Sequence, residues 1–310
     1  LFSIELSRQL LDREGKITDH FCFGGAQIFR IVETQDAGDI IQRIVPAMTA
    51  AAIRPYAARF PACANGGHVL APVQSFLLFA DGRRILIDTG IGNGKPLCGG
   101  WGGLDTDWLD RLTVAAPPET IDTVICTHLH ADHVGWNTRL QNGAWTPTFP
   151  HAKYHLPAGD LEDLRARLPE LSPDDVCVLR DSIAPVLAAG AAVPVPYGER
   201  AITDTVSLVP TPGHTPHHLA VRVTAGGRSL LFCGDLFYHV CQAEHPAWGA
   251  EDNPLLLATR LRVLAEAAAR GSLLFFGHMP YPLRITADAD GYTAHPVREA
   301  NLLKGDDDAE

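Results

Sequence analysis

One short segment constrains this chain more than any other: His128, His130, Asp132 and His133 follow one another as His-x-His-x-Asp-His. The segment comes directly after Ile121–Cys126, a short and mostly apolar run that predicts a buried strand. Side chains two residues apart in an extended chain point to the same side, so His128 and His130 can share one cation. Asp132 and His133 lie where the chain turns toward a helix, and they can face a second cation beside the first.

Two metal ions need more than four ligands, and three further candidates stand at the ends of apolar runs. They are His214 in Thr-Pro-Gly-His-Thr, Asp235 in Cys-Gly-Asp and His278 in Phe-Gly-His. Imidazole and carboxylate ligands suit zinc, but also iron, manganese or cobalt. The pattern contains no obvious thiolate ligand, so the identity of the metal stays open.

The rest of the chain alternates strand patterns with helical patterns and shows no repeat of solenoid length. Two alternating runs, 73–79 and 84–87, flank Asp81-Gly82 and predict a hairpin. The pattern also predicts a helical arm over 40–58 and an amphipathic helix over 254–270. This order favours an α/β protein in which helices cover a sandwich of two mixed sheets.

No linker interrupts the pattern, so we expect a single domain over 1–310. Within it we expect an N-terminal arm over 1–65, a catalytic core over 66–300 and a flexible acidic tail over 301–310. A glycine-rich loop spans 90–103, and the sequence does not indicate its role.

The amino-acid composition indicates which binding partners and which cellular compartment to expect. The 25 Lys and Arg residues against 36 Asp and Glu residues give a formal net charge of -11. This charge argues against nucleic-acid phosphates as the main partner and favours an uncharged substrate. No apolar run reaches the length of a membrane span. The seven scattered cysteines argue against a disulfide framework and favour a reducing cytoplasm.

Taken in order, the motifs resemble those of the metallo-β-lactamase superfamily over about 76–279. The motifs are Leu86–Gly90, Thr127–His133, Thr211–His214, Gly234-Asp235 and Gly277-His278. The resemblance implies an αββα sandwich with a dinuclear site at one edge of its two sheets, and two divalent ions, foremost Zn²⁺. It implies that the first ion takes His128, His130 and His214, and that the second takes Asp132, His133 and His278, with Asp235 bridging both and Asp88 orienting a ligand.

Within the superfamily the chain resembles N-acyl homoserine lactone lactonases and methyl parathion hydrolase-like enzymes. The lactonases carry a tyrosine three residues after the bridging aspartate, where this chain has Tyr238. The methyl parathion hydrolase-like enzymes have a Gly-Asp-Leu segment followed by His-Val, and this chain has the same residues at 234–236 and 239–240. N-terminal arms in this group help to form dimers, so a homodimer is expected.

The resemblance implies a hydrolase of neutral small-molecule esters, with lactones first and phosphotriesters as a secondary activity. A hydroxide bridging the two metal ions would attack the carbonyl carbon or the phosphorus. Tyr238 would donate a hydrogen bond to the developing oxyanion, and Asp132 would pass a proton to the leaving alkoxide. Three alternatives remain open: an organophosphate hydrolase, a glyoxalase II-like thioesterase and a mononuclear iron persulfide dioxygenase.

Other residues near the motifs are candidates for the substrate pocket. The candidates for its apolar wall are Trp136, Phe237 and Trp248, and His239 is a further candidate for its lining. His217 and His218 follow His214 closely, but the ligand set that the resemblance implies is already full. We therefore expect these two histidines either to contact a metal ligand without binding the ion themselves or to begin the next strand.

Overall fold

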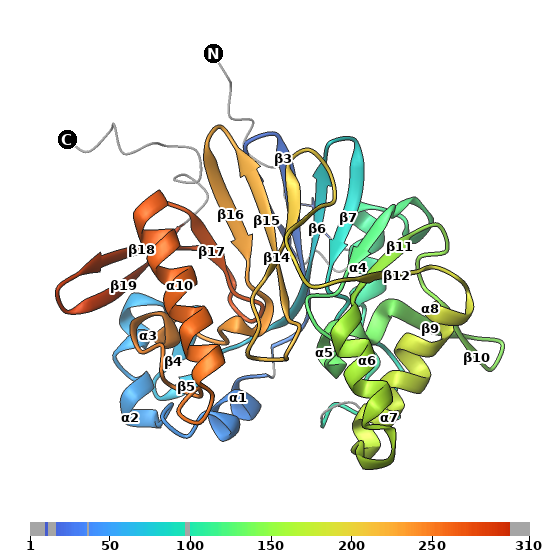
Figure 1. Cartoon of the computed structure of the whole chain (residues 1–310), viewed down its shortest axis with the longest axis horizontal. Coiled ribbons are helices and arrows are strands. Elements are labelled where there is room, and N and C mark those ends of the chain that lie inside the picture. The colour runs from blue at the N-terminus through green and yellow to red at the C-terminus, as the bar shows by residue number, and fades with distance from the viewer. Residues whose placement is uncertain (1–9, 12–16, 36, 97–99, 298–310) are drawn as a thin grey trace.

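Two β-sheets lie face to face, and helices cover the outer face of each sheet (Figure 1). The structure is a computed structural model that describes residues 10–11, 17–35, 37–96 and 100–297. Each sheet contains both parallel and antiparallel pairs, so the α/β sandwich of two mixed sheets expected from the sequence is confirmed. The predicted acidic tail over 301–310 lies outside the described residues.

The first sheet has eight strands. In spatial order they are β1 (Leu10–Leu11), β2 (Ile17–Phe23), β3 (Ala26–Thr34), β6 (Val73–Ala80), β7 (Arg83–Ile87), β8 (Thr123–Ile125), β11 (Lys153–Pro157) and β12 (Ala192–Val195). β6 and β7 form the predicted hairpin, and Asp81 and Gly82 at its turn both have positive φ. β7 and β8 pair in parallel, so their carboxyl ends lie at the same edge.

The second sheet has seven strands. In spatial order they are β13 (Arg200–Ala201), β14 (Val206–Pro210), β15 (Leu219–Ala225), β16 (Arg228–Phe232), β17 (Leu273–Phe275), β18 (Leu283–Asp288) and β19 (Gly291–Pro296). Its parallel pair is β16 with β17. Two small separate hairpins consist of β4 (Ala64–Asn65) with β5 (His68–Val69), and β9 (Thr138–Gln141) with β10 (Ala144–Pro147).

The space between the sheets is filled by apolar side chains from alternate strand positions. Phe76 and Leu78 of β6 face the second sheet, whereas Leu77 between them packs under the helices on the outer face. The ring of Phe76 lies 4.5 Å from that of Phe275 on β17. Burial on both faces explains why β6 is almost continuously apolar.

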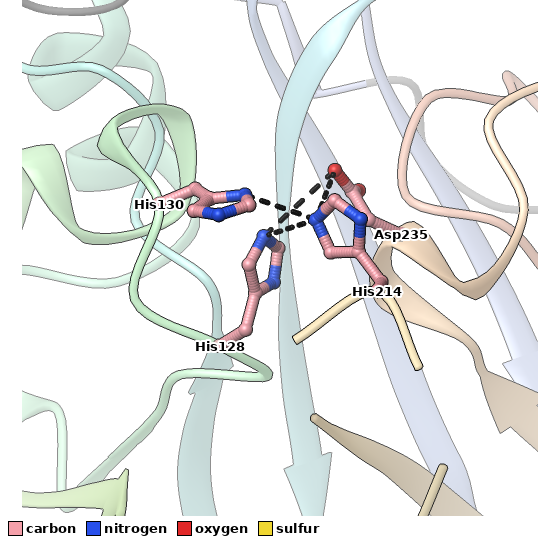
Figure 2. Close-up of side chains that lie close together, drawn as sticks. All are labelled: His128, His130, His214 and Asp235. Atoms are coloured by element: carbon pink, nitrogen blue, oxygen red, sulfur yellow. Dashed lines mark hydrogen bonds and ion pairs between the residues drawn. The ribbon is translucent and has the colours of Figure 1, made fainter. Parts of the chain in front are cut away.

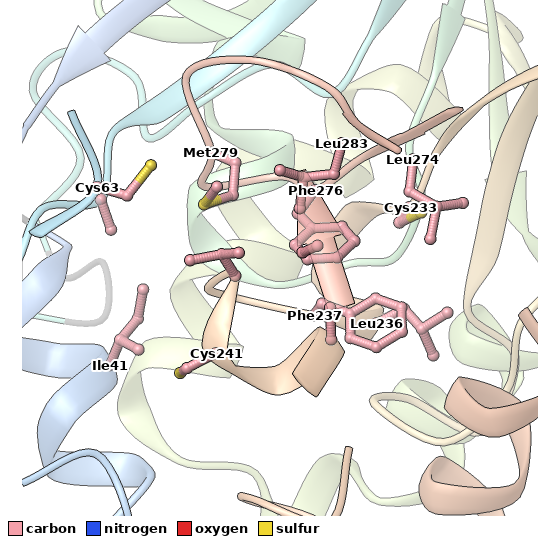
Figure 3. Close-up of a cluster of buried hydrophobic side chains, with 14 of the residues drawn as sticks. Ile41, Cys63, Cys233, Leu236, Phe237, Cys241, Leu274, Phe276, Met279 and Leu283 are labelled. Atoms are coloured by element: carbon pink, nitrogen blue, oxygen red, sulfur yellow. The ribbon is translucent and has the colours of Figure 1, made fainter. Parts of the chain in front are cut away.

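The helices divide between the two outer faces. Outside the first sheet lie α4 (Trp108–Ala115), α5 (Ala131–Val134), α6 (Ala158–Ala166), α7 (Pro173–Val178) and α8 (Ala184–Ala188). Packed with the second sheet are α1 (Gly38–Ile44), α2 (Ala50–Ile53), α3 (Tyr56–Arg59), α9 (Cys241–Glu244) and α10 (Pro254–Arg270). Figure 3 shows part of this second cluster, in which Ile41 of the N-terminal arm shares an apolar core with Leu236 and Phe276.

The N-terminal arm differs from the prediction of one helix over 40–58. It contains the three short helices α1, α2 and α3. Pro46 follows α1 and Pro55 precedes α3, and proline cannot donate the backbone hydrogen bond that a continuous helix needs. The helix predicted over 254–270 is confirmed, and it ends at Gly271 in the left-handed conformation. Among the described residues, no helix combines the length and the apolarity needed to cross a membrane.

Gly135 lies where the segment after β8 closely approaches the segment after β7. Its backbone nitrogen donates to the carbonyl of Gly90 at 2.7 Å, and a Cβ at this position would overlap the carbonyl group of Ile91. We expect Gly135→Ala to lower the free energy of unfolding by about 1–3 kcal/mol, because the backbone must shift to make room. Urea denaturation would measure this loss.

Gly25→Ala is the matched control for this prediction. A Cβ at Gly25 would meet no atom within 4 Å. We expect its free energy of unfolding to stay within about 0.5 kcal/mol of the unmodified protein. Equal losses in the two variants would contradict the close approach at Gly135.

Candidate metal centre

Segments that follow five strands meet at one edge of the sandwich. They carry Asp88 after β7, 127–133 after β8, 211–214 after β14, Gly234-Asp235 after β16 and His278 after β17. Two parallel pairs, β7 with β8 and β16 with β17, direct four of these segments to the same edge. Residues up to 190 positions apart in the chain therefore lie together, as the motifs predict.

The first group consists of His128, His130, His214 and Asp235, with one potential ligand atom from each residue within 4.8 Å of the others. Figure 2 shows the three imidazoles and the carboxylate converging. Nε2 of His214 lies 3.1 Å from Nε2 of His128 and 2.9 Å from Nδ1 of His130. Oδ2 of Asp235 lies 3.5 Å from Nε2 of His214. This group could hold one cation.

The second group consists of Asp132, His133, His278 and again Asp235. Oδ1 of Asp235 lies 3.2 Å from Nε2 of both His133 and His278. Oδ2 of Asp132 lies 3.6 Å from the same two nitrogens. The two oxygens of Asp235 thus face one group each, so this carboxylate is common to both.

The hydrogen bonds of the histidines in the second group determine which ring nitrogen can bind a metal ion. Nδ1 of His133 lies 2.8 Å from Oδ2 of Asp88, and Nδ1 of His278 lies 2.8 Å from the carbonyl oxygen of Pro72. Both partners accept, so in the neutral rings the proton stays on Nδ1 and Nε2 presents a lone pair to Asp235. Nε2 of His133 and Oδ1 of Asp235 are buried without a hydrogen-bond partner in the described part of the chain. A divalent cation would satisfy both atoms.

The charges in the site favour a cation at the second group. Burial lowers the pKa of His133, but the carboxylates of Asp235, Asp132 and Asp88 outweigh burial and raise this pKa well above its usual value. These carboxylates therefore favour positive charge at Nε2, either as a proton or as a metal ion in its place. In the first group, burial and the neighbouring imidazole of His133 hold the pKa of His128 well below its usual value. His128 is therefore neutral and can offer a lone pair to a metal ion.

Asp88 lies against the back of the site. Its Oδ1 accepts from the backbone nitrogen of Thr127 at 2.7 Å, and its Oδ2 accepts from the Thr127 hydroxyl at 2.9 Å. Together with its contact to His133, these bonds tie the carboxyl end of β7 to the start of the histidine motif. Asp88 can therefore orient His133, which is the role that the resemblance implies.

Tyr238 connects the site to the neighbouring cavity. Its hydroxyl lies 3.1 Å from Nδ1 of His214, on the side of the ring that faces away from the other ligand candidates. Burial raises the pKa of Tyr238 far above its usual value, so the hydroxyl keeps its proton at neutral pH. It can accept from His214 and still donate toward the cavity.

A cavity of about 310 Å³ opens beside both groups. One wall consists of His130, Asp132, His214, Asp235, Tyr238 and His278. The other walls come from Ala37, Ile40, Ile41 and Ile44 of the N-terminal arm, from Trp101 of the glycine-rich loop, and from Ser172, Asp174, Asp175 and Val178 on or before α7. The cavity is thus apolar on the side of the arm and acidic on the side of α7.

Comparison with known proteins identifies the family. A profile described as Metallo-beta-lactamase superfamily matches residues 69–278. The chain belongs to this superfamily. The match spans all five strand-end segments, so it includes every residue of the two groups.

Curated relatives in the superfamily differ in what their names describe. A ribonuclease of Thermus thermophilus is 32% identical over 168 residues, which cover 53% of this chain and 35% of the ribonuclease. A probable metallo-hydrolase of Mycobacterium tuberculosis is 32% identical over 185 residues and is covered to 56%. The alignments thus span about half or less of these two relatives. An N-acyl homoserine lactonase of Bacillus thuringiensis is 25% identical over 224 residues, covering 67% of this chain and 81% of the lactonase.

Solved structures of superfamily members share the fold over most of the chain. A structure described as hydrolase AbOPH has a TM-score of 0.71 at 20% identity, covering 91% of this chain and 99% of that one. AidC, described as a dizinc quorum-quenching lactonase, has a TM-score of 0.69 at 19% identity, covering 91% and 97%. At these identities the likeness concerns the fold.

The structure corrects the expected pocket lining, because none of the four candidate residues lines the cavity. Trp136 stacks on Trp108 and donates to the buried Glu33 at 2.7 Å. Phe237 stacks on Phe276 within the apolar core. The other two also have partners elsewhere: His239 contacts the carbonyl of Cys63 at 3.0 Å, and Trp248 stacks on His245. The positions of these residues close to the motifs in the sequence did not indicate where their side chains point.

The residues that do line the apolar side carry little sequence signal. Ile40, Ile41 and Ile44 have the spacing of an ordinary helix face that packs on a core. Ile41 does so and is buried, whereas Ile44 is 53% exposed. Trp101 is the one aromatic residue of the glycine-rich loop, and this contrast in composition is the only signal that could have singled it out.

Proposed function

We propose that this metallo-hydrolase fold holds two divalent metal ions, foremost Zn²⁺, and opens lactone esters of the acyl homoserine lactone type. One observation carries the proposal: Asp235 presents one oxygen to each of two groups, and its Oδ1 lies 3.2 Å from Nε2 of His133, with both atoms buried. Two cations that share this carboxylate would satisfy the arrangement.

The first ion would be held by His128, His130, His214 and Asp235, and the second by Asp132, His133, His278 and Asp235. When bound, the ions supply a water of lowered pKa and positive charge beside the scissile bond.

Two side chains of this chain would complete the reaction. Tyr238 donates its hydroxyl proton in a hydrogen bond to the oxygen on which negative charge develops. Asp132 lines the cavity and would carry the proton that the attacking water loses to the leaving alkoxide. Both lie on the cavity wall formed by the metal groups, so a bound ester would contact both.

The walls of the cavity support a neutral substrate with an apolar chain. The arm and Trp101 offer apolar surface, and the described lining contains no lysine or arginine that would pair with an anion. The names of the lactonase relatives agree with this chemistry, and AidC was solved with the product N-hexanoyl-L-homoserine. Cleavage of neutral phosphotriesters would be a secondary activity of the same site.

The test is an assay of the Zn²⁺-loaded protein on acyl homoserine lactones with short and long chains, simple lactones, methyl parathion, a thioester and an RNA oligonucleotide. We expect the acyl homoserine lactones to give the highest kcat/KM and a His130→Ala variant to give none. Turnover of the thioester or the RNA alone, or no turnover above the His130→Ala variant, would contradict the proposal.

The position of Ile44 at the cavity gives a prediction about recognition of the substrate's acyl chain. We expect Ile44→Ala to raise KM for a long-chain lactone by about tenfold at unchanged kcat, because apolar contact with the chain is lost in both the ground and transition states. Steady-state kinetics would measure this. Val114→Ala is the matched control, since Val114 is an exposed β-branched residue on α4. An unchanged KM in Ile44→Ala would show that the acyl chain of the substrate binds elsewhere.

Two further expectations concern the state of the protein. We propose a homodimer assembled through the N-terminal arm, and a cytoplasmic location. Sedimentation equilibrium would test the first, and a mass of one chain at all concentrations would contradict it. Fractionation of the source cells would test the second.

A further inference from the structure

His218 is fully buried beside the two groups but belongs to neither. Its ring lies 5.3 Å from that of His128 and 5.9 Å from that of His214. It directly precedes β15, and its carbonyl accepts from the backbone nitrogen of Thr211 at 2.9 Å. A buried imidazole without a ligand role needs a partner for each ring nitrogen, and these partners show what the ring does.

Both partners of His218 are present and together define its tautomer. The backbone nitrogen of Asp235 donates to Nε2 at 3.2 Å. A backbone N–H only donates, so Nε2 carries the lone pair and Nδ1 carries the proton. Nδ1 lies 2.8 Å from the hydroxyl oxygen of Thr211, which therefore accepts. The ring thus connects the end of β14 to the segment that carries Asp235.

The turn at Gly234 packs directly against this ring. Gly234 has a φ of +49°, and a Cβ there would lie 2.6 Å from Nε2 of His218 and 2.8 Å from the hydroxyl oxygen of Thr127. The turn is thus enclosed between His218 and the start of the histidine motif. Any rotation of the turn would move both oxygens of the Asp235 carboxylate, which face different groups.

We propose that His218 is a positioning residue that holds the Gly234-Asp235 turn, and through it aligns the Asp235 carboxylate for both metal ions. The inference rests on the proposed two-metal function and adds a residue to it. Loss of the acceptor at Nε2 leaves the buried N–H of Asp235 without a partner, so the turn rotates to find another. Both ions then bind more weakly, whereas loss of a ligand that belongs to one group weakens one ion.

Two substitutions separate the functions of the two ring nitrogens. His218→Gln places an amide oxygen near the position of Nε2 and can keep the bond from Asp235. His218→Asn places an amide near the position of Nδ1 and can keep only the bond to Thr211. The readout is the affinity for each of the two Zn²⁺ ions, measured by competition with a chromogenic chelator. The matched control is His151→Asn, at an exposed histidine.

We expect both Zn²⁺ affinities to fall about 10- to 100-fold in His218→Asn, and to stay within a few-fold of the unmodified protein in His218→Gln and His151→Asn. Equal affinities in His218→Asn and the unmodified protein, or weakening of one ion alone, would overturn the inference. Thr211→Val removes the acceptor of the Nδ1 proton without changing the ring, and we expect a smaller loss at both ions. Unchanged affinities in this variant would also overturn it.

The unmodified protein separates this inference from the proposed function. If it binds fewer than two Zn²⁺ ions, the two-metal proposal fails whatever the variants do. If it binds two ions, and His218→Asn and His218→Gln bind them with equal affinity, only the role of His218 is wrong.

Discussion

Replacing Asp235 by alanine should lower kcat/KM for the preferred lactone by about 1000-fold or more, since a catalytic metal ion supplies several kcal/mol of transition-state stabilisation. The substitution removes the one carboxylate that both groups share. We expect both Zn²⁺ affinities to fall by more than about 100-fold, which exceeds the loss expected for a residue that only supports a ligand. Metal analysis after dialysis and steady-state kinetics would measure the two effects.

Asp252→Ala is the control for this prediction, because Asp252 is an exposed aspartate in a loop before α10. It should keep the kinetics and the metal content of the unmodified protein. Loss of a single ion in Asp235→Ala, with the other bound as tightly as before, would show that the carboxylate serves one group. That result would contradict the shared position of Asp235.

Tyr238→Phe should lower kcat by about 100- to 1000-fold, the usual effect of removing one hydrogen-bond donor to an oxyanion. The phenyl ring keeps the packing of Tyr238 and removes only its hydroxyl. A second and smaller effect follows from the 3.1 Å contact with Nδ1 of His214. We expect the ion held by His128, His130 and His214 to bind up to about tenfold more weakly, because the orientation of His214 is less restricted.

The two effects of Tyr238→Phe are measured separately, with kcat under saturating Zn²⁺ and affinity by chelator competition. Tyr197→Phe is the control, since Tyr197 is 65% exposed. A loss of activity that excess Zn²⁺ fully restores would assign Tyr238 to metal binding alone. Unchanged kcat in Tyr238→Phe would contradict its proposed role at the oxyanion.

The gathering of the candidate metal ligands could be predicted from the sequence because each belongs to a short motif at the end of an apolar strand. His128 and His130 carry most of this signal, and the strand pattern places them at an edge where His214, Asp235 and His278 must also lie. Parallel pairing of β7 with β8 and of β16 with β17 then brings the strand ends together. The sandwich of two mixed sheets follows from the same alternation of strands and helices.

The cavity beside the two groups could not be predicted in the same way, since its walls depend on how distant elements pack. Ile41 and Ile44 lie on one short helix, yet the first is buried and the second is half exposed. Trp136 follows the histidine motif by three residues but points to Glu33. Such directions are set by tertiary contacts that leave no periodic signal in the chain.

His218 shows a third case, in which the sequence marks a residue without defining its action. Its position four residues after His214 predicted either a supporting role or the start of the next strand. What it supports depends on one hydrogen bond from Asp235, across 17 positions of the chain. Hydrogen bonds between loops of this kind become visible only once the strand ends are placed side by side.

The most direct test of the proposed two-metal centre is the number of Zn²⁺ ions bound per chain, measured by elemental analysis of the dialysed protein and of single-ligand variants. We predict two ions in the unmodified protein and one ion in His130→Ala, where only the first group is damaged, and one in His278→Ala, where only the second group is damaged. A single ion in the unmodified protein that is lost in both variants would contradict the account.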